Sequence, residues 1–233
     1  MKNLLYKEFR LATPLPTFLF LGFALMSFLP GYPILCGAFF VCFGIFQSYQ
    51  MGAGDNDVLY SVLLPVRKTD VVKAKFAAAM VLQTAAFAVC AVCTGIRMTF
   101  LSDAAVYTSN ALMGANLIFL AFVLLIFAAF NVVFIGGFFK TAYRFGKPFV
   151  AFVIVNFVII GIAETLHHLP GLAWMNALDF SYPVRQTAIL LAGVLIYLAL
   201  TQTACRLAQE KFEKLDLGPC PSKKTGAKRP CLF

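Results

Sequence analysis

Apolar runs long enough to cross a membrane recur along this chain of 233 residues. A helix needs about 20 mostly apolar residues to cross the roughly 30 Å hydrocarbon core of a bilayer. Residues 121–129 are apolar at every position, which excludes the alternating pattern of a spanning β-strand. Charged residues make up only 12% of the sequence, about half the share typical of soluble domains. The sequence therefore predicts an all-α polytopic membrane protein.

Polar breaks divide the chain into six predicted transmembrane helices. They cover about 15–30, 34–51, 76–96, 111–139, 148–166 and 187–205. Only Gly31, Tyr32 and Pro33 separate the first two, so these should form a tight hairpin. We therefore expect an interfacial helix at 1–14, a six-span domain at 15–206 and a basic, partly disordered tail at 207–233.

The positive charges lie almost entirely on alternate breaks between these spans. Seventeen of the 19 Lys and Arg residues precede the first span or follow the second, fourth and sixth, which leaves only Arg97 and Arg185. Lys and Arg are retained on the cytoplasmic side during insertion, so both termini are predicted to be cytoplasmic. A basic rim also suits anionic lipids, and the net charge of +9 therefore gives no reason to expect nucleic-acid binding.

The first 14 residues have the pattern of an amphipathic helix. Leu5, Tyr6, Phe9 and Ala12 fall on one side, and Asn3, Lys7 and Arg10 fall on the other. This pattern predicts a helix lying along the inner leaflet, where its cations meet the lipid headgroups. A frayed basic leader is the alternative.

The break between the second and third spans has a helical pattern of its own. Residues 55–57, Asp-Asn-Asp, offer N-caps for a helix of about two turns that Pro65 ends. A new helix should begin near Thr69 and continue into the third span. Since a two-turn helix is not stable alone, its apolar residues should dock on a partner protein or in the lipid interface.

Residues 1–11, MKNLLYKEFRL, and residues 56–76, NDVLYSVLLPVRKTDVVKAKF, carry a family resemblance. The chain resembles bacterial ABC-2 type transporter permeases, the small six-span kind without a fused ATPase. The resemblance implies a coupling helix at 55–70 that seats in a groove of an ABC ATPase subunit. It also implies a second permease subunit, in a homodimer or a heterodimer. The residues implied to bind the ATPase are Leu59, Val62, Leu63, Leu64, Arg67 and Lys68, of which the two cations are alternatively plain membrane anchors.

The chain lacks the G-x-x-x-x-G-K-[ST] loop that would hold ATP phosphates, because Gly146 and Lys147 are followed by Pro148. We therefore expect no catalytic residue and no bound cofactor here, with ATP and Mg²⁺ in the partner subunit. The expected function is that of the permease subunit of an ABC exporter in the bacterial cytoplasmic membrane. A stand-alone membrane protein, either an anchor or regulator or a secondary transporter, is the alternative.

Amides within the spans are the candidates for a substrate path. They are Gln47, Gln50, Gln83, Asn116, Asn131 and Asn156. Such side chains also bond between helices, so a purely structural role is the alternative. No charged residue lies at the centre of a span, which disfavours a proton-coupled or sodium-coupled transporter.

Glu164, His167 and His168 are spaced to share one helical face, as zinc ligands would. An intramembrane metalloenzyme is therefore a further alternative. No H-E-x-x-H motif is present, however, and the cluster lies at the outward end of the fifth span beside Pro170 and Gly171. A polar helix end without metal is the expected interpretation.

Overall fold

The computed structural model describes residues 2–55, 57, 61, 65–102, 104–108, 110–141, 144–178 and 181–214. All regular structure within these residues is helical, which agrees with the predicted fold class. The first half contains α1 (Lys2–Lys7), the π-helix η1 (Glu8–Ala12), α2 (Leu15–Leu21), the 3-10 helix η2 (Gly22–Phe28), α3 (Cys36–Gly54), α5 (Lys68–Phe100) and α6 (Ala105–Thr108). The second half contains α7 (Leu117–Ala129), the π-helix η3 (Phe130–Ile135), α8 (Gly136–Lys140), α9 (Gly146–Leu166), the 3-10 helix η4 (Ala173–Asn176) and α10 (Pro183–Glu213).

Four continuous helices in the described residues are long and apolar enough to cross a membrane. They are α5, the helix formed by α7, η3 and α8, and then α9 and α10. A fifth candidate appears if the segments Asn3–Leu11 and Leu15–Phe28, which are bent by 90°, count as one span. The predicted number of six spans stays a prediction. α2 and η2 have only seven residues each, and the polar residues Gln47, Ser48 and Gln50 interrupt the apolar pattern near the end of α3.

The predicted hairpin between the first two apolar segments is confirmed, since α2 and η2 pack against α3. The turn includes Gly31 at φ +73°, a conformation that glycine adopts without strain. Gly44 allows the close approach, because a Cβ atom at this position would lie 2.5 Å from the Cβ of Phe20. Thr17 then donates to the Gly44 carbonyl at 2.8 Å.

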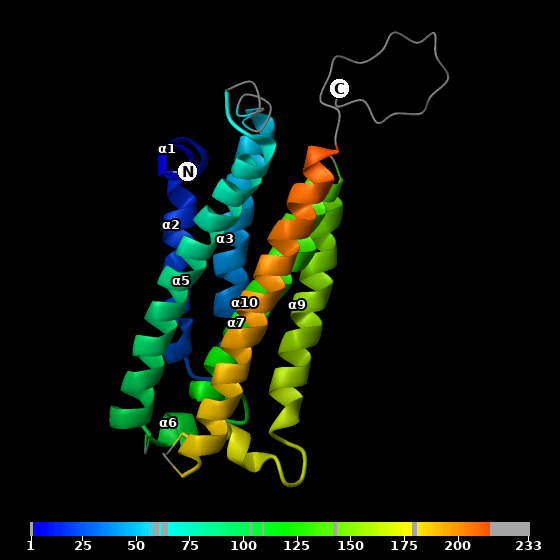
Figure 1. The fold of residues 1–233 in the computed structure, drawn as a ribbon. Helices are drawn as coiled ribbons and strands as arrows, with labels where there is room; N and C mark the ends of the chain where they lie inside the picture. The colour runs from blue at the N-terminus through cyan, green and yellow to red at the C-terminus, as the bar shows by residue number, and fades with distance from the viewer. Residues whose placement is uncertain are drawn as a thin grey trace.

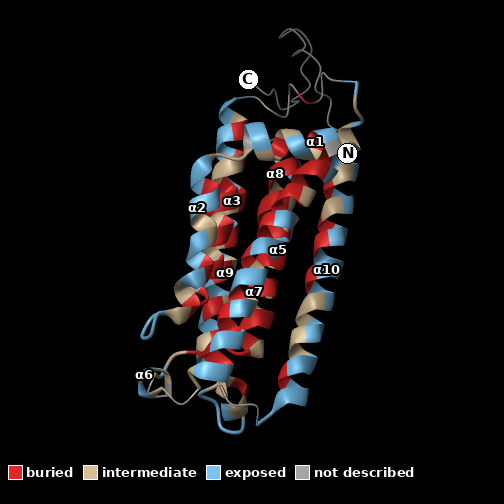
Figure 2. Ribbon diagram, turned by 90° about the vertical axis from the view of Figure 1, so that its left-hand side faces the viewer, coloured by how far each residue is buried: buried red, intermediate tan, exposed pale blue. Residues whose placement is uncertain are grey.

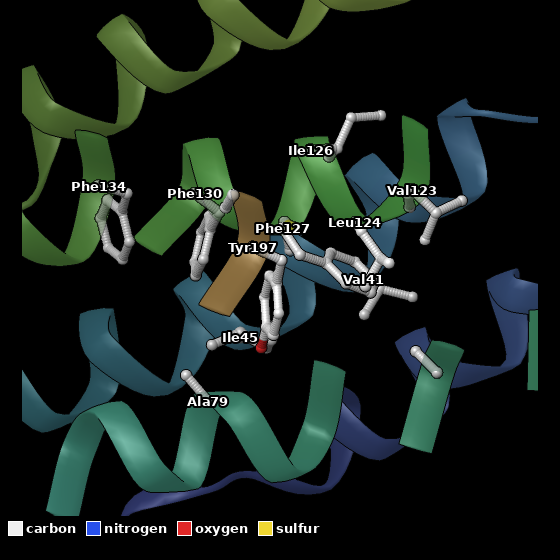
Figure 3. Packing of buried hydrophobic residues seen from close by; sticks show 14 of the residues in the cluster. Val41, Ile45, Ala79, Val123, Leu124, Ile126, Phe127, Phe130, Phe134 and Tyr197 are labelled. Atoms are coloured by element: carbon white, nitrogen blue, oxygen red, sulfur yellow. The ribbon is translucent and has the colours of Figure 1, made fainter. Parts of the chain in front are cut away.

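The helix formed by α7, η3 and α8 is the centre of the bundle. Its most apolar stretch is 72% buried, whereas those of α9 and α10 are each 22% buried. Figure 3 shows Phe127, Phe130 and Phe134 from this helix among side chains of α3 and α5. Figure 2 shows α7 largely buried and α10 largely exposed. The exposed apolar side chains of α9 and α10, such as Ile154 and Leu195, suit contact with lipid.

Three helices have boundaries that differ from the predicted spans. α7 begins at Leu117 rather than near 111, because Asn116 caps it and accepts hydrogen bonds from the amides of Ile118 and Phe119, each at 3.0 Å. α5 extends to Lys68 and Phe100, and α10 extends to Glu213, beyond the apolar stretches that hydropathy detects. The predicted helix start near Thr69 is confirmed to within one residue.

The helices give the bundle two distinct ends (Figure 1). What we call the basic end holds α1, η1, the connection between α3 and α5, the connection between α8 and α9, and the last turns of α10. The opposite end holds η2, α6 and η4. The described parts of the four cation-rich segments thus lie at the basic end, while Arg97, near the end of α5, and Arg185, near the start of α10, lie near the opposite end.

Candidate functional site

Four charged side chains meet at the basic end and form what we call the charge network: Lys7, Glu8, Asp57 and Lys75. Lys75 Nζ lies 2.9 Å from Glu8 Oε2 and 2.9 Å from Asp57 Oδ2. Lys7 Nζ lies 3.2 Å from Glu8 Oε1 and 2.5 Å from Asp57 Oδ1. Each ammonium therefore bridges both carboxylates, and the network as a whole is neutral.

Three separate segments supply these residues. Lys7 and Glu8 lie where α1 passes into η1, and Asp57 lies in the connection between α3 and α5. Lys75 lies on the buried face of α5, together with Val71 and Ala79. Lys75 and Glu8 are buried, at 4% and 5% exposed, whereas the side chains of Lys7 and Asp57 are partly exposed, at 17% and 16%. Burying an ion pair is favourable only if its geometry satisfies both partners, and here each carboxylate oxygen has an ammonium partner.

The network also holds the chain between α3 and α5. Lys7 Nζ donates to Ser61 Oγ at 2.6 Å, and the Ser61 hydroxyl donates to the Asp57 carbonyl at 2.7 Å. Asp57 and Ser61 lie four residues apart in this connection. Both are thus tied to α1 through Lys7, and Asp57 is also tied to α5 through Lys75.

The ammonium groups set the ionisation of Asp57. Burial by itself would raise the pKa of its carboxyl, but the charges and hydrogen bonds of Lys75 and Lys7 outweigh burial and lower this pKa below its ordinary value of 3.8. Asp57 is therefore ionised at neutral pH and completes the network.

A small cavity lies beside the network and extends it into the bundle. It measures about 20 Å³, room for about one water molecule, and Glu8, Thr13, Ser48, Tyr49 and Lys75 supply its polar lining. Tyr49 also places its ring 5.6 Å from Lys75 Nζ and donates its hydroxyl to the Lys75 carbonyl at 3.4 Å. The network thus rests on α3 as well as on α5.

The predicted ATPase-binding residues lie next to this network in the sequence. Leu59, Val62, Leu63 and Leu64 lie outside the described residues. Arg67 has an extended backbone and an exposed side chain just before α5, and Lys68 is the first residue of α5. Their role as contacts or anchors stays a prediction.

The predicted polar face of the N-terminal helix is wrong for Lys7. Lys7 turns inward to the charge network, whereas Tyr6 is 62% exposed and accepts a hydrogen bond from Arg10 at 2.6 Å. Periodicity alone places cations outward, because it includes no information about distant carboxylates. Glu8 and Lys75 are the overlooked sign of this ion pairing in the sequence, because each is a charged residue within an otherwise apolar helix face.

Two of the six candidate amides meet in the middle of the bundle. Gln83 and Asn131 exchange two hydrogen bonds, at 2.9 and 3.0 Å. Asn131, which lies in the π-helix η3, also donates to Thr201 at 3.0 Å, and Tyr197 donates to Gln83 at 2.9 Å. Figure 3 shows Tyr197 reaching from α10 with its oxygen toward α5. This arrangement supports a role in joining α5, η3 and α10.

The other four candidate amides lie elsewhere. Gln47 is half-buried and Gln50 is exposed on α3. Asn116 caps α7 at the opposite end and donates to the Met175 carbonyl at 2.7 Å. Asn156 is fully buried in α9, and neither its Oδ1 nor its Nδ2 atom has a hydrogen-bond partner. The six amides therefore do not form one continuous polar path in this conformation.

The candidate zinc ligands bind the backbone of the segment before α7. Glu164 Oε2 accepts from the Met113 amide at 2.8 Å, and His167 Nε2 lies 3.1 Å from the Ala111 carbonyl. The His168 ring lies 4.1 Å from the His167 ring. Within the described part of the chain, no group of three or more His, Cys, Asp or Glu residues is arranged to hold a metal ion.

No curated protein and no solved structure matches this chain. Residues 3–206, however, match the family described as ABC-2 family transporter protein. The match covers α1 through most of α10 and includes the charge network and the central amide pair. Membership of this family indicates a multi-pass membrane protein that serves as a transport subunit, and it implies association with an ABC ATPase. The chain therefore belongs to the ABC-2 transporter family.

Proposed function

We propose that this chain is the permease subunit of an ABC exporter in the bacterial cytoplasmic membrane. Two permease subunits, identical or different, assemble with a separate ATPase that binds ATP and Mg²⁺. The chain crosses the membrane six times, and its basic end, with both termini, faces the cytoplasm. The distribution of Lys and Arg supports this orientation.

The observation that carries the proposal is the charge network around Asp57 and Lys75. A short segment that pushes on a membrane helix must be attached firmly to that helix. The network attaches Asp57, within the 55–70 segment, to α5 through Lys75, and attaches Asp57 and Ser61 to the N-terminal helix through Lys7. A displacement of the segment by an ATPase is then transmitted to two helices at once.

The contact with the ATPase is assigned to the apolar residues of this segment, with Arg67 and Lys68 beside them. A groove that buries one Leu side chain gains about 1.5–3 kcal/mol. A carboxylate left without a partner in the same groove costs more than this gain. One Leu-to-Asp substitution should therefore separate the two subunits.

The test is Leu63→Asp in the full chain, purified with the ATPase that co-purifies with the unmodified chain. We expect normal membrane insertion and yield, loss of the ATPase from the purified complex, and loss of transport-stimulated ATP hydrolysis. Leu11→Asp is the matched control, because Leu11 is 76% exposed at the same end of the bundle and lies outside the segment. An intact complex with the Leu63→Asp chain contradicts the proposal.

A further inference from the structure

A second buried charge lies far from the charge network, at the opposite end. Arg97 is three residues from the end of α5 and only 3% exposed. Its Nη1 donates to the Ser27 carbonyl at 2.6 Å, and its guanidinium carbon lies 4.0 Å from the centre of the Tyr107 ring. Both partners are uncharged. The four ion pairs of the described residues all belong to the charge network.

The arginine keeps one edge without a partner. Its Nε atom is buried and makes no hydrogen bond. The hydroxyl of Thr94, which is 1% exposed, also has no hydrogen-bond partner. Residues three apart on a helix lie on the same face, so these two unused groups are neighbours on α5.

An arginine cannot release its proton in a protein, so the positive charge of Arg97 persists despite its burial. A buried charge is costly unless an opposite charge or full hydrogen bonding compensates it. The missing partner is therefore an anion. An oxyanion fits best, because a guanidinium edge binds two of its oxygens in parallel and a Thr hydroxyl can donate to the same group.

The depth of Arg97 indicates which oxyanion it meets. α5 has 33 residues and is about 50 Å long, so it extends past the roughly 30 Å hydrocarbon core. Its final turn, with Arg97, directly follows the predicted span 76–96 and would therefore reach the lipid headgroups at the opposite end. The phosphodiester of a phospholipid is the oxyanion that every bilayer presents at this level.

The 3-10 helix η2 packs against α5 and accepts a hydrogen bond from Arg97. Seven residues is long for a 3-10 helix, which rarely exceeds three or four residues because its hydrogen-bond geometry is poor. Two hydrogen bonds hold its end: Arg97 to the Ser27 carbonyl, and Tyr107 to the Phe28 carbonyl at 2.9 Å. Exchange of these bonds for a ligand would release the end of η2 from Arg97 on α5 and from Tyr107 on α6.

We propose that Arg97 and Thr94 form a binding site for the phosphodiester headgroup of a phospholipid, between η2 and α5 at the opposite end of the bundle. The site does not depend on the proposed ATPase contact, which lies at the other end. It places a lipid-binding group where an exporter releases its cargo.

The test measures thermal unfolding of the full chain, purified free of lipid in an uncharged detergent. Dihexanoyl phosphatidylglycerol and inorganic phosphate are added separately, with sodium chloride at equal ionic strength as the reference. Saturating ligand should raise the unfolding temperature of the unmodified chain by roughly 2–4 °C. Native mass spectrometry should count one bound lipid.

Three variants assign the shift to the site. Thr94→Val keeps the shape of the side chain and removes the donor, and Arg97→Lys keeps the charge but not the paired geometry. Both should lose most of the ligand-induced shift and the bound lipid. Arg185→Lys is the matched control, because Arg185 is exposed near the same end, and it should respond as the unmodified chain does.

A rise in the unfolding temperature with the lipid but not with inorganic phosphate supports the headgroup site. An equal rise with inorganic phosphate shows instead that the site binds an oxyanion from a soluble source. No shift with either compound overturns the proposal. An unchanged shift and an unchanged lipid count in Thr94→Val also overturn it, even if Arg97→Lys fails to fold.

Discussion

The two ends of the bundle are held together by different chemistry. At the basic end, two ammonium groups and two carboxylates join η1, the segment around Asp57 and α5. At the opposite end, neutral amides bind the backbone of the turn around η4. Asn176 accepts from the Gly114 amide at 2.6 Å, and Gln186 donates to the Ala177 carbonyl at 3.0 Å.

This contrast has a mechanical consequence. A buried ion network loses several kcal/mol if one charge is removed, so its members move together or not at all. A neutral hydrogen bond contributes only about 1 kcal/mol net and can be exchanged for water or a ligand. The basic end should therefore transmit force as one unit, while the opposite end opens in small steps.

The largest effect is expected from Lys75→Met. Met fills most of the volume of Lys but leaves Glu8 and Asp57 with Lys7 alone, which gives the buried network a net negative charge. We expect a loss of about 3–5 kcal/mol in the free energy of unfolding. Unfolding of the purified chain in mixed micelles with increasing sodium dodecyl sulfate measures it.

Two further variants separate charge from packing. Lys73→Met removes an exposed cation two residues away in the same helix and should change the stability by less than about 0.5 kcal/mol. Adding Glu8→Gln to Lys75→Met restores a neutral network and should recover part of the loss. If the double variant is no more stable than the single one, the network does not act as one unit.

Hydropathy in the sequence predicts most of the helices but not their positions in the bundle. The helix formed by α7, η3 and α8 is the most apolar one and is central, whereas α10 is peripheral. Hydropathy cannot predict this difference, because lipid and the protein interior are equally apolar environments. The charge network was also not predictable in this way, because Glu8 and Lys75 are 67 residues apart. A local signal was missed as well: Asn116 stands directly before an apolar run, as a helix N-cap does, whereas hydropathy placed the start of this span near 111.

A smaller effect is expected at the opposite end, from Asn116→Ala. The substitution removes the cap of α7 and leaves the Met175 carbonyl without its donor. Loss of such a cap costs about 0.5–2 kcal/mol, well below the loss expected for Lys75→Met. The same detergent unfolding series measures it, with Asn3→Ala at an exposed position as the control. A loss as large as that of Lys75→Met would mean that the two ends do not differ as described.

The smallest effect is expected from acidification between pH 7 and pH 5, and its near absence is informative. The ammonium groups lower the pKa of Asp57 below 3.8 in the folded chain. A carboxyl whose pKa is lower in the folded state stabilises the fold above its unfolded pKa, and this contribution disappears as the pH falls through the folded pKa. The difference in unfolding free energy between the unmodified chain and Asp57→Asn should thus be constant from pH 7 to pH 5 and shrink only below about pH 4. If the difference already shrinks near pH 5 or 6, Asp57 does not have a lowered pKa, and the network is not the ionic unit that sets the basic end apart from the opposite end, where the described residues form no ion pair.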